Sequence, residues 1–319
     1  MLIKNLKEIN KDYMNKTIEA IVLIVETKVK TARNDKVYAD MIIQDASKQV
    51  EAKYWDYAKK EKFTSSIKED EPVKIKCVVG EYQGRIQVTI KSIEKIEENI
   101  DLDKLIPSSD WGTDKLEKGL KYFRDLVEEN HLQKLLDLMI WDEKYYAKFC
   151  SHPAAKRVHH NFRQGLLQHV LEVLKFAYTI AKTKNLTEKQ ISRLIVMCFL
   201  HDWAKIIEYK SLPAIGFTDE GTMLGHIFLG AHHTLNCMNQ IDNFDEDDRL
   251  VILNGILGHH GKYEYGSPVL PKTVEAQILH LADVTSGDVE SIISFSNDDD
   301  SKESFTPKLW NMGTDYFKR

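Results

Sequence analysis

The period of the hydrophobic pattern changes once along the chain, and this change constrains the fold most strongly. Up to residue 95, apolar and polar residues alternate in stretches rich in β-branched side chains, such as "TIEAIVLIVETKVKTA". From residue 115 onward, apolar residues recur with a helical period instead. Alternation is typical of half-buried strands, and the longer period is typical of amphipathic helices. We therefore expect a multi-domain α and β protein, in which a β domain precedes an all-α domain. The 319 residues suffice for two hydrophobic cores.

The first domain is expected at residues 1–96, as a small β-barrel of the OB type. Alternating stretches lie before and after the Asp45-Ala46-Ser47 turn, and the last one is broken by Gln83-Gly84. A short helical link is expected near Tyr57 to Phe63. Five short strands in a closed meander with one such link are typical of this barrel.

The second domain follows a polar connector at residues 97–114, which contains a Pro-Ser-Ser turn. Residues 115–319 are expected to form an all-helical domain with a C-terminal tail. Helical periodicity predicts helices at Lys115–Glu129, Leu132–Met139, Gly165–Thr183, Glu188–His201, Thr222–Ile241, Asp245–Gly258 and Thr273–Gly287.

Composition excludes several classes of protein. The hydrophobic fraction of 43% and the charged fraction of 29% are typical of globular domains. The longest apolar runs, "AIVLIV" and "LIVMCFL", are too short to span a bilayer, so we expect no membrane partner. The first residues contain no apolar core of a signal peptide, and the four scattered cysteines form no CxxC pair, so a cytoplasmic location is expected.

Histidines lie on the apolar faces of several predicted helices. His169 shares its stripe with Leu166 and Val173, while His201 ends the run "LIVMCFL" and precedes Asp202. A lone histidine of this kind is usually a hydrogen-bonded core residue. Four helices with inward histidines, joined by two aspartates, need a partner that offsets their desolvation. Divalent metal ions are such a partner, and mixed imidazole and carboxylate ligands suit Mn, Fe, Ni, Zn or Mg. The residues in question are His169, His201, Asp202, His226, His259, His260 and Asp283.

The order of these residues resembles the HD phosphohydrolase superfamily, whose all-α core carries a His…His-Asp…Asp metal site. Its usual HDxGK motif stands here as His201-Asp202-Trp203-Ala204-Lys205. Alanine in place of glycine is expected to narrow the room for a phosphate without removing a ligand. The resemblance implies two divalent ions, with manganese expected ahead of iron, nickel, cobalt, zinc or magnesium. It assigns His169, His201, Asp202 and Asp283 to the first ion, and His226 and His259 to the second, with Asp202 as the bridge. Whether His260 replaces or joins His259 stays open.

Two longer segments narrow the resemblance. "PAAKRVHHNFRQGLLQHV" resembles the entry to the HD core in nucleic-acid-processing members. "ILGHHGKYEYGSPVLPKTVEAQILHLADVTSG" is similar to the YhaM-type 3′-to-5′ exoribonucleases of Gram-positive bacteria, which also place an OB domain before the HD domain. The resemblance implies a metal-dependent phosphodiesterase that hydrolyses single-stranded RNA from its 3′ end. Single-stranded DNA is a further substrate to consider, and the products would be nucleoside 5′-monophosphates formed with a metal-activated water.

Within this implied function, Asp202 and Lys205 are the catalytic candidates, with Lys205 placed to contact the scissile phosphate. His159, His160 and Arg163 are expected to contact the substrate backbone, although the two histidines could equally be structural. An OB barrel binds single strands through stacked bases and paired phosphates. The alternative is that its aromatic residues fill the barrel, since such residues favour strands anyway. The candidates for exposed contacts are Tyr38, Trp55, Tyr82 and Arg85.

Two other functions stay open. An HD phosphodiesterase for small or cyclic nucleotides would share every metal ligand, and only the OB domain argues against it. A non-catalytic single-strand DNA-binding factor would need the OB domain alone, yet it has no reason to keep so many costly polar groups inside. The sequence leaves open the identity of the metal, the preference for RNA or DNA, and the oligomeric state, including a homo-oligomer.

Overall fold

The computed structural model describes residues 2–68, 71–82, 85–96, 100–155, 160–212, 216–299 and 303–318, without the side chains of Tyr82, Arg85, Asp103 and Asp298. The chain divides into two compact units. The first holds the described residues of 1–108 and 296–319 together with Leu212, and the second holds those of 109–211 and 216–295. Each unit has its own hydrophobic core.

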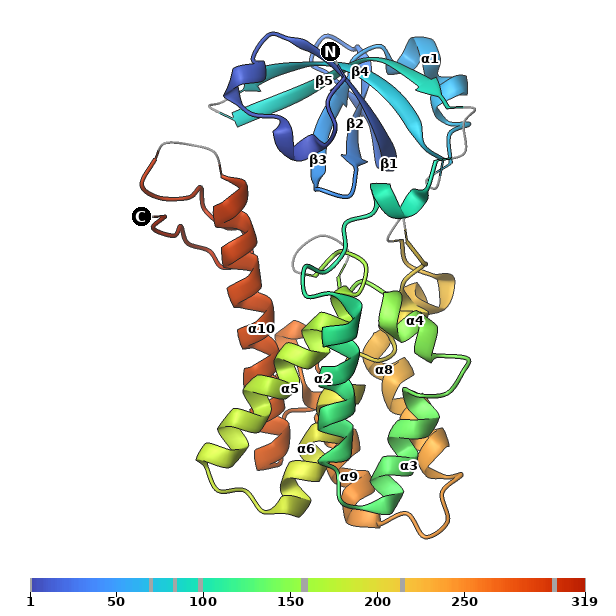
Figure 1. Ribbon diagram of the computed structural model, residues 1–319, viewed down its shortest axis with the longest axis vertical. Coiled ribbons are helices and arrows are strands. Elements are labelled where there is room, and N and C mark those ends of the chain that lie inside the picture. Colours follow the sequence, from blue (N-terminus) through green and yellow to red (C-terminus); the bar gives the residue numbers. More distant parts are fainter. Residues whose placement is uncertain are drawn as a thin grey trace. The chain divides into compact units, whose positions relative to one another are not determined.

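The first unit is a closed barrel whose strands lie in the order β1-β2-β3-β5-β4 (Figure 1). Apolar side chains such as Ile18, Ile43 and Ile75 fill its interior. This confirms the expected five-stranded OB-type barrel with a helix between the third and fourth strands. The elements are β1 (Thr17–Thr31), β2 (Val37–Gln44), β3 (Gln49–Tyr54), α1 (Tyr57–Thr64), β4 (Val73–Tyr82) and β5 (Arg85–Lys95), with single 3₁₀ turns at Leu6–Glu8, Lys11–Tyr13 and Leu102–Leu105.

The strand connections differ from the predicted closed meander of short strands. β3 pairs in parallel with β5, through Ala52–Tyr54 and Val88–Ile90, so β5 lies between β3 and β4. β1 is 15 residues long and pairs first with β4 and then with β2, with a register shift between Ile24 and Glu26. Such an irregularity bends a strand between two partners. An alternating pattern specifies a strand and its buried face, but it does not specify which strands pair.

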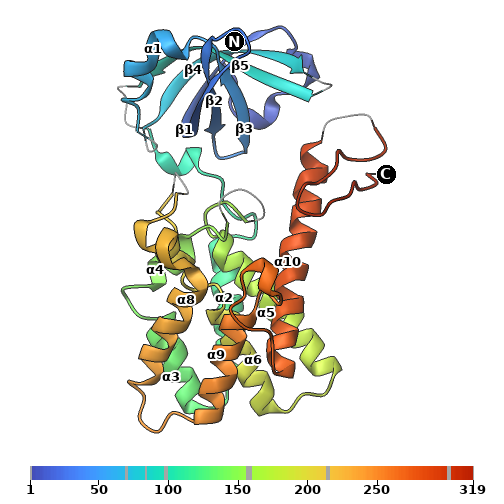
Figure 2. The same ribbon diagram turned by 180° about the vertical axis from the view of Figure 1, so that it is seen from behind.

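The second unit is helical, as predicted (Figure 2). α5 has its predicted bounds, and α3, α6 and α9 lie within two residues of theirs. The short α4 and α7 were not predicted, because one or two turns contain too few positions to show a period. α10 continues to Asp298, past its predicted end at Gly287. The helices are α2 (Thr113–Asp125), α3 (Asn130–Met139), α4 (Tyr146–Ser151), α5 (Gly165–Thr183), α6 (Glu188–Leu200), α7 (Lys205–Glu208), α8 (Asp219–Met238), α9 (Glu246–Gly258) and α10 (Val274–Asp298), with a 3₁₀ turn at Tyr263–Tyr265.

α5 and α6 carry the most deeply buried segments of this unit. A capping box between Thr187 and Gln190 begins α6, and the helix ends at Leu200. In the turn that follows, Trp203 is fully buried and its Nε1 donates to the Met139 carbonyl at 2.6 Å. This bond anchors the turn to the end of α3. Among the helices within the described ranges, none has the length and apolarity needed to cross a membrane.

Candidate metal centre

Four side chains meet inside the second unit. His169 lies on α5, His201 and Asp202 follow α6, and Asp283 lies on α10. Each offers a donor atom within 4.8 Å of the other three. His169 Nε2 is 3.3 Å from Asp202 Oδ2, 3.2 Å from Asp283 Oδ1 and 3.3 Å from His201 Nε2. Donor atoms that bind one divalent ion at about 2.0–2.2 Å lie roughly 3–3.5 Å from one another. The spacing of these four side chains therefore fits a metal ion.

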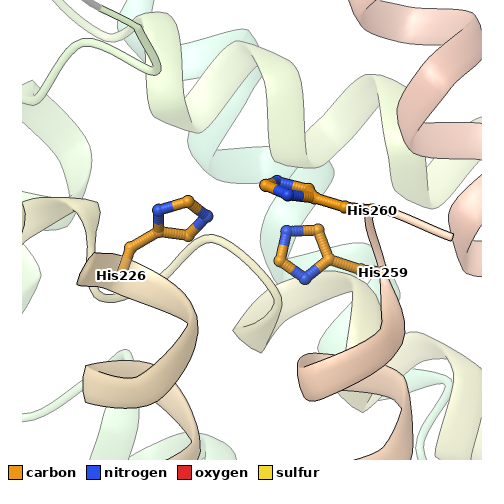
Figure 3. A group of neighbouring side chains, drawn as sticks. All are labelled: His226, His259 and His260. Atoms are coloured by element: carbon orange, nitrogen blue, oxygen red, sulfur yellow. The ribbon is translucent and has the colours of Figure 1, made fainter. Parts of the chain in front are cut away.

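Three further histidines form a second cluster beside the first. His226 lies on α8, and His259 and His260 directly follow α9. Figure 3 shows the three imidazoles gathered together, and one nitrogen of each lies within 4.8 Å of the others. Asp202 Oδ1 adjoins this group, at 3.5 Å from His226 Nε2 and 3.7 Å from His259 Nε2. These three buried atoms have no hydrogen-bond partner among the residues that the structure describes. Buried polar atoms are rarely left so, and a second ion would satisfy all three.

Asp202 is common to both clusters. Its Oδ2 faces His169 and His201, and its Oδ1 faces His226 and His259. A carboxylate that presents its two oxygens to two sets of ligands is suited to hold two metal ions a few ångströms apart.

Three of these histidines are oriented by backbone carbonyls. A carbonyl oxygen only accepts, so each Nδ1 that contacts one carries the ring proton, and Nε2 keeps the lone pair that a metal needs. Nδ1 of His201, His259 and His260 donates to the carbonyls of Cys198, Ile256 and Tyr265 at 2.9, 2.7 and 2.8 Å, respectively.

The other two histidines are oriented by side chains that the sequence did not predict. His226 Nδ1 lies 3.0 Å from Glu208 Oε1. His169 Nδ1 lies 3.0 Å from Ser286 Oγ, which in turn donates to Glu172 Oε2 at 2.8 Å. Such outer partners fix the ring orientation of metal-binding histidines. Glu172 follows His169 by three residues on the same helical face, and this spacing is a signal that the sequence provides. No such spacing links Glu208 to His226 or Ser286 to His169.

The electrostatics of the two clusters favour cations. Burial lowers the pKa of His169, but the carboxylates of Asp202 and Asp283 outweigh it and raise that pKa to about 9. Burial lowers the pKa of His259 well below its ordinary value, and neighbouring His260 lowers it further. The first cluster therefore stabilises a positive charge, and in the second cluster His259 is favoured as neutral imidazole, which is the form that binds metal.

Lys205 is engaged with the shared aspartate. It is only 9% exposed, and its Nζ donates to Asp202 Oδ2 at 2.7 Å. Burial lowers the pKa of Lys205, but the charge of Asp202 outweighs this and raises that pKa above its ordinary value. If this ammonium group contacts a phosphate, it would therefore have to contact Asp202 and the phosphate at the same time.

The residues predicted to contact the substrate backbone precede α5. His159 lies outside the described residues. His160 is 1% exposed, its Nε2 lies 3.2 Å from Glu172 Oε2, and its ring centroid lies 5.4 Å from that of His169. Its side chain thus has almost no surface that could meet a substrate. Arg163 is half-buried, and its carbonyl accepts from the Ser109 N–H at 3.1 Å.

Two of the four nucleic-acid candidates in the barrel lie together. Tyr38, on β2, stacks on Trp55, just after β3, with ring centroids 4.6 Å apart. Lys53 Nζ lies 4.9 Å from the Tyr38 ring and 5.9 Å from the Trp55 ring. Half-exposed aromatic faces beside a cation suit the bases and phosphates of a single strand. The side chains of Tyr82 and Arg85 lie outside the described part of the chain.

Comparison with known proteins gives the same architecture. Residues 166–288 match the HD domain family, and residues 17–96 match the tRNA_anti-codon family, an OB-fold nucleic acid binding domain. The chain thus joins a region that matches an OB-fold domain to a region that matches the HD domain.

Two curated relatives match most of the chain. The chain is 28% identical to the 3'-5' exoribonuclease YhaM of Bacillus subtilis (strain 168) over 271 residues, which cover 83% of each protein. It is 28% identical to the 3'-5' exoribonuclease YhaM of Listeria innocua over 276 residues, which cover 86% of each. The predicted resemblance to the YhaM-type proteins is therefore confirmed. Among solved structures, the second OB-fold domain of replication protein A from Methanococcus maripaludis covers 32% of this chain and all of its own, with 13% identity and a TM-score of 0.24, too slight a likeness to bear on function.

Proposed function

We propose that this chain is a metal-dependent 3′-to-5′ exoribonuclease that hydrolyses single-stranded RNA to nucleoside 5′-monophosphates. The observation that carries the proposal is Asp202, which places one oxygen in each of two clusters that fit metal ions. The relatives named 3'-5' exoribonuclease support the reaction and its direction. The OB-fold domain supports a single-stranded nucleic acid as the substrate, with DNA as a second candidate.

The metal centre would hold two divalent ions. Bound ions of this kind activate a water molecule and stabilise negative charge on the phosphoryl oxygens. We propose manganese, because imidazole and carboxylate ligands without a thiolate suit it, and iron, nickel, cobalt, zinc and magnesium are the alternatives. The first ion would be held by His169, His201, Asp202 and Asp283, and the second by Asp202, His226, His259 and His260.

The chain's own residues would position the substrate around these ions. Asp202 would hold both ions, and Lys205, which donates to Asp202 Oδ2, would offer a cation to the scissile phosphate. We propose that the buried His160 supports the packing around His169 and does not contact the substrate. The remaining substrate contacts are proposed at His159 and Arg163 in the second domain, and at Tyr38, Trp55, Tyr82 and Arg85 in the barrel.

The two domains would divide the work. Residues 1–96 would bind the single-stranded nucleic acid, and residues 97–114 would connect the two domains. Residues 115–319 would hydrolyse the bound strand. We place this activity in the cytoplasm.

Incubation with 5′-labelled single-stranded RNA and Mn²⁺, beside nucleoside triphosphates and cyclic dinucleotides, tests the proposal. We expect a ladder that shortens from the 3′ end, with release of 5′-monophosphates. Hydrolysis of the small molecules with intact RNA would favour a nucleotide phosphodiesterase instead. Binding of single strands without cleavage under any divalent metal would favour a binding factor.

A further inference from the structure

Helix α8 is interrupted one residue before His226. Inside Asp219–Met238, Gly225 has φ 70° and ψ 156°, which are not helical values. A positive φ favours glycine, whereas a Cβ at Gly225 would meet no atom within 4 Å. Only the backbone conformation therefore requires glycine here. The interruption frees the His226 N–H from the helical bonding pattern, and this donor turns to a side chain.

That side chain is Glu208, which takes two donors from one residue. Its Oε1 accepts from the His226 backbone N–H at 3.0 Å and from His226 Nδ1 at 3.0 Å. Glu208 is 6% exposed, so both bonds are shielded from water. One bond fixes the backbone of His226 and the other fixes the rotation of its ring. Nε2 then faces Asp202 Oδ1 at 3.5 Å.

The backbone of Glu208 is itself held against the start of α8. Thr218 donates its N–H to the Glu208 carbonyl at 2.9 Å, and its Oγ1 caps the helix by accepting from the Gly221 N–H at 2.8 Å. A Cβ on Gly221 would lie 2.3 Å from the Glu208 carbonyl oxygen, so glycine is needed for this close approach. One short stretch, Asp202 to Glu208, thus contacts His226 from both sides of its ring.

From these contacts we infer that Glu208 is a positioning residue for the second metal position, and that the break at Gly225 allows it to act. The inference rests on the proposed metal centre. Glu208 acts through His226, and within the described residues its side chain makes no hydrogen bond or ion pair with a ligand of the first cluster. There, His169 has a separate support in Ser286. Loss of Glu208 should therefore weaken one metal position and spare the other.

Titration of the metal-free full-length protein with Mn²⁺, followed by calorimetry and by metal analysis, tests the inference. We expect wild type to bind two ions. Glu208→Ala should bind the first ion as wild type does and the second 10–100-fold more weakly, the usual effect of removing such an outer partner. Glu208→Gln should keep both ions, because its amide oxygen still accepts both bonds. The matched control is Glu220→Ala, which removes an exposed carboxylate from the first turn of α8, the helix that carries His226. This variant should also keep both ions.

Wild-type affinity for both ions in Glu208→Ala would overturn the inference, and so would an equal weakening of both positions in a folded variant. If circular dichroism shows that Glu208→Ala does not fold, Gly225→Ala decides, since a Cβ at φ 70° strains the break that His226 needs. Selective weakening of the second ion supports the inference, and wild-type binding contradicts it. A wild-type protein that binds no Mn²⁺ would instead overturn the metal centre itself, and the inference with it.

Discussion

Lys205 and Asp202 form a buried ion pair where the two ligand clusters meet. Nζ lies 2.7 Å from Oδ2, and the two residues are 9% and 2% exposed. A buried carboxylate loses its hydration, and an ammonium group at hydrogen-bonding distance compensates for much of that loss. The lysine therefore stabilises the arrangement of the centre in addition to any contact with a substrate.

Lys205→Met should separate these two contributions. Without the ammonium group, Asp202 is less well compensated, so we expect the free energy of unfolding of the metal-free protein to fall by about 3 kcal/mol. We expect RNA hydrolysis to fall by about 100-fold or more, because the variant lacks the charge that we propose to face the phosphate. Urea unfolding in the presence of a chelator and the cleavage assay measure the two effects. Lys182→Met, at an exposed lysine of α5, is the matched control and should resemble wild type in both.

A Lys205→Met variant that unfolds at the wild-type urea concentration would show that the pair does not stabilise the centre. Wild-type cleavage by that variant would remove Lys205 from the catalytic residues.

Glu172 should make the stability of the metal-free protein depend on pH. Burial raises the pKa of Glu172, but hydrogen bonds from His160, Gln168 and Ser286 outweigh it and lower that pKa from 4.5 to about 2. A carboxyl group whose pKa is lower in the folded state contributes stability above its unfolded pKa and loses it as pH falls through the folded pKa. We therefore expect about 3 kcal/mol of stability to disappear between pH 4.5 and about 2. Urea unfolding across this window should show the loss in wild type and much less of it in Glu172→Gln. An unchanged slope in Glu172→Gln would contradict the assignment.

The stacked pair on the barrel should matter for long substrates and not for small ones. If Tyr38 and Trp55 each stack on a base, alanine at either position should remove about 1–3 kcal/mol of binding, which is roughly a 5–150-fold rise in KM for RNA. Hydrolysis of a small phosphodiester, bis(p-nitrophenyl) phosphate, should not change, because that substrate has no nucleobase to stack on the pair. Tyr38→Phe keeps the ring and serves as the control. A Trp55→Ala variant with wild-type KM for RNA would exclude this face from substrate binding.

The residues of the centre were predictable where they interrupt an apolar stripe. His201 and Asp202 end an apolar run, and His169 replaces an apolar residue on the inner face of α5, so their desolvation was visible in the sequence. Glu208 was not predictable, since it lies on a four-residue helix and acts on His226 across a break at Gly225. A break that depends on one backbone angle leaves no periodic signal.

Ala204 is a second residue whose surroundings were not predictable from the sequence. Its substitution for the usual glycine of the motif was expected to narrow the room for a phosphate. In the structure Ala204 is fully buried, and a Cβ added at Gly230 of α8 would lie 3.6 Å from its methyl carbon. The methyl group therefore packs toward α8. The direction of a single side chain depends on tertiary packing, which the motif alone does not contain.

A crystal structure of the Mn²⁺-bound protein, with the ions located by anomalous scattering, tests most directly the claim that two metal positions share Asp202. We expect two anomalous peaks, one at Asp202 Oδ2 beside His169 and the other at Asp202 Oδ1 beside His226. A single peak, or two peaks of which one does not touch Asp202, would contradict it.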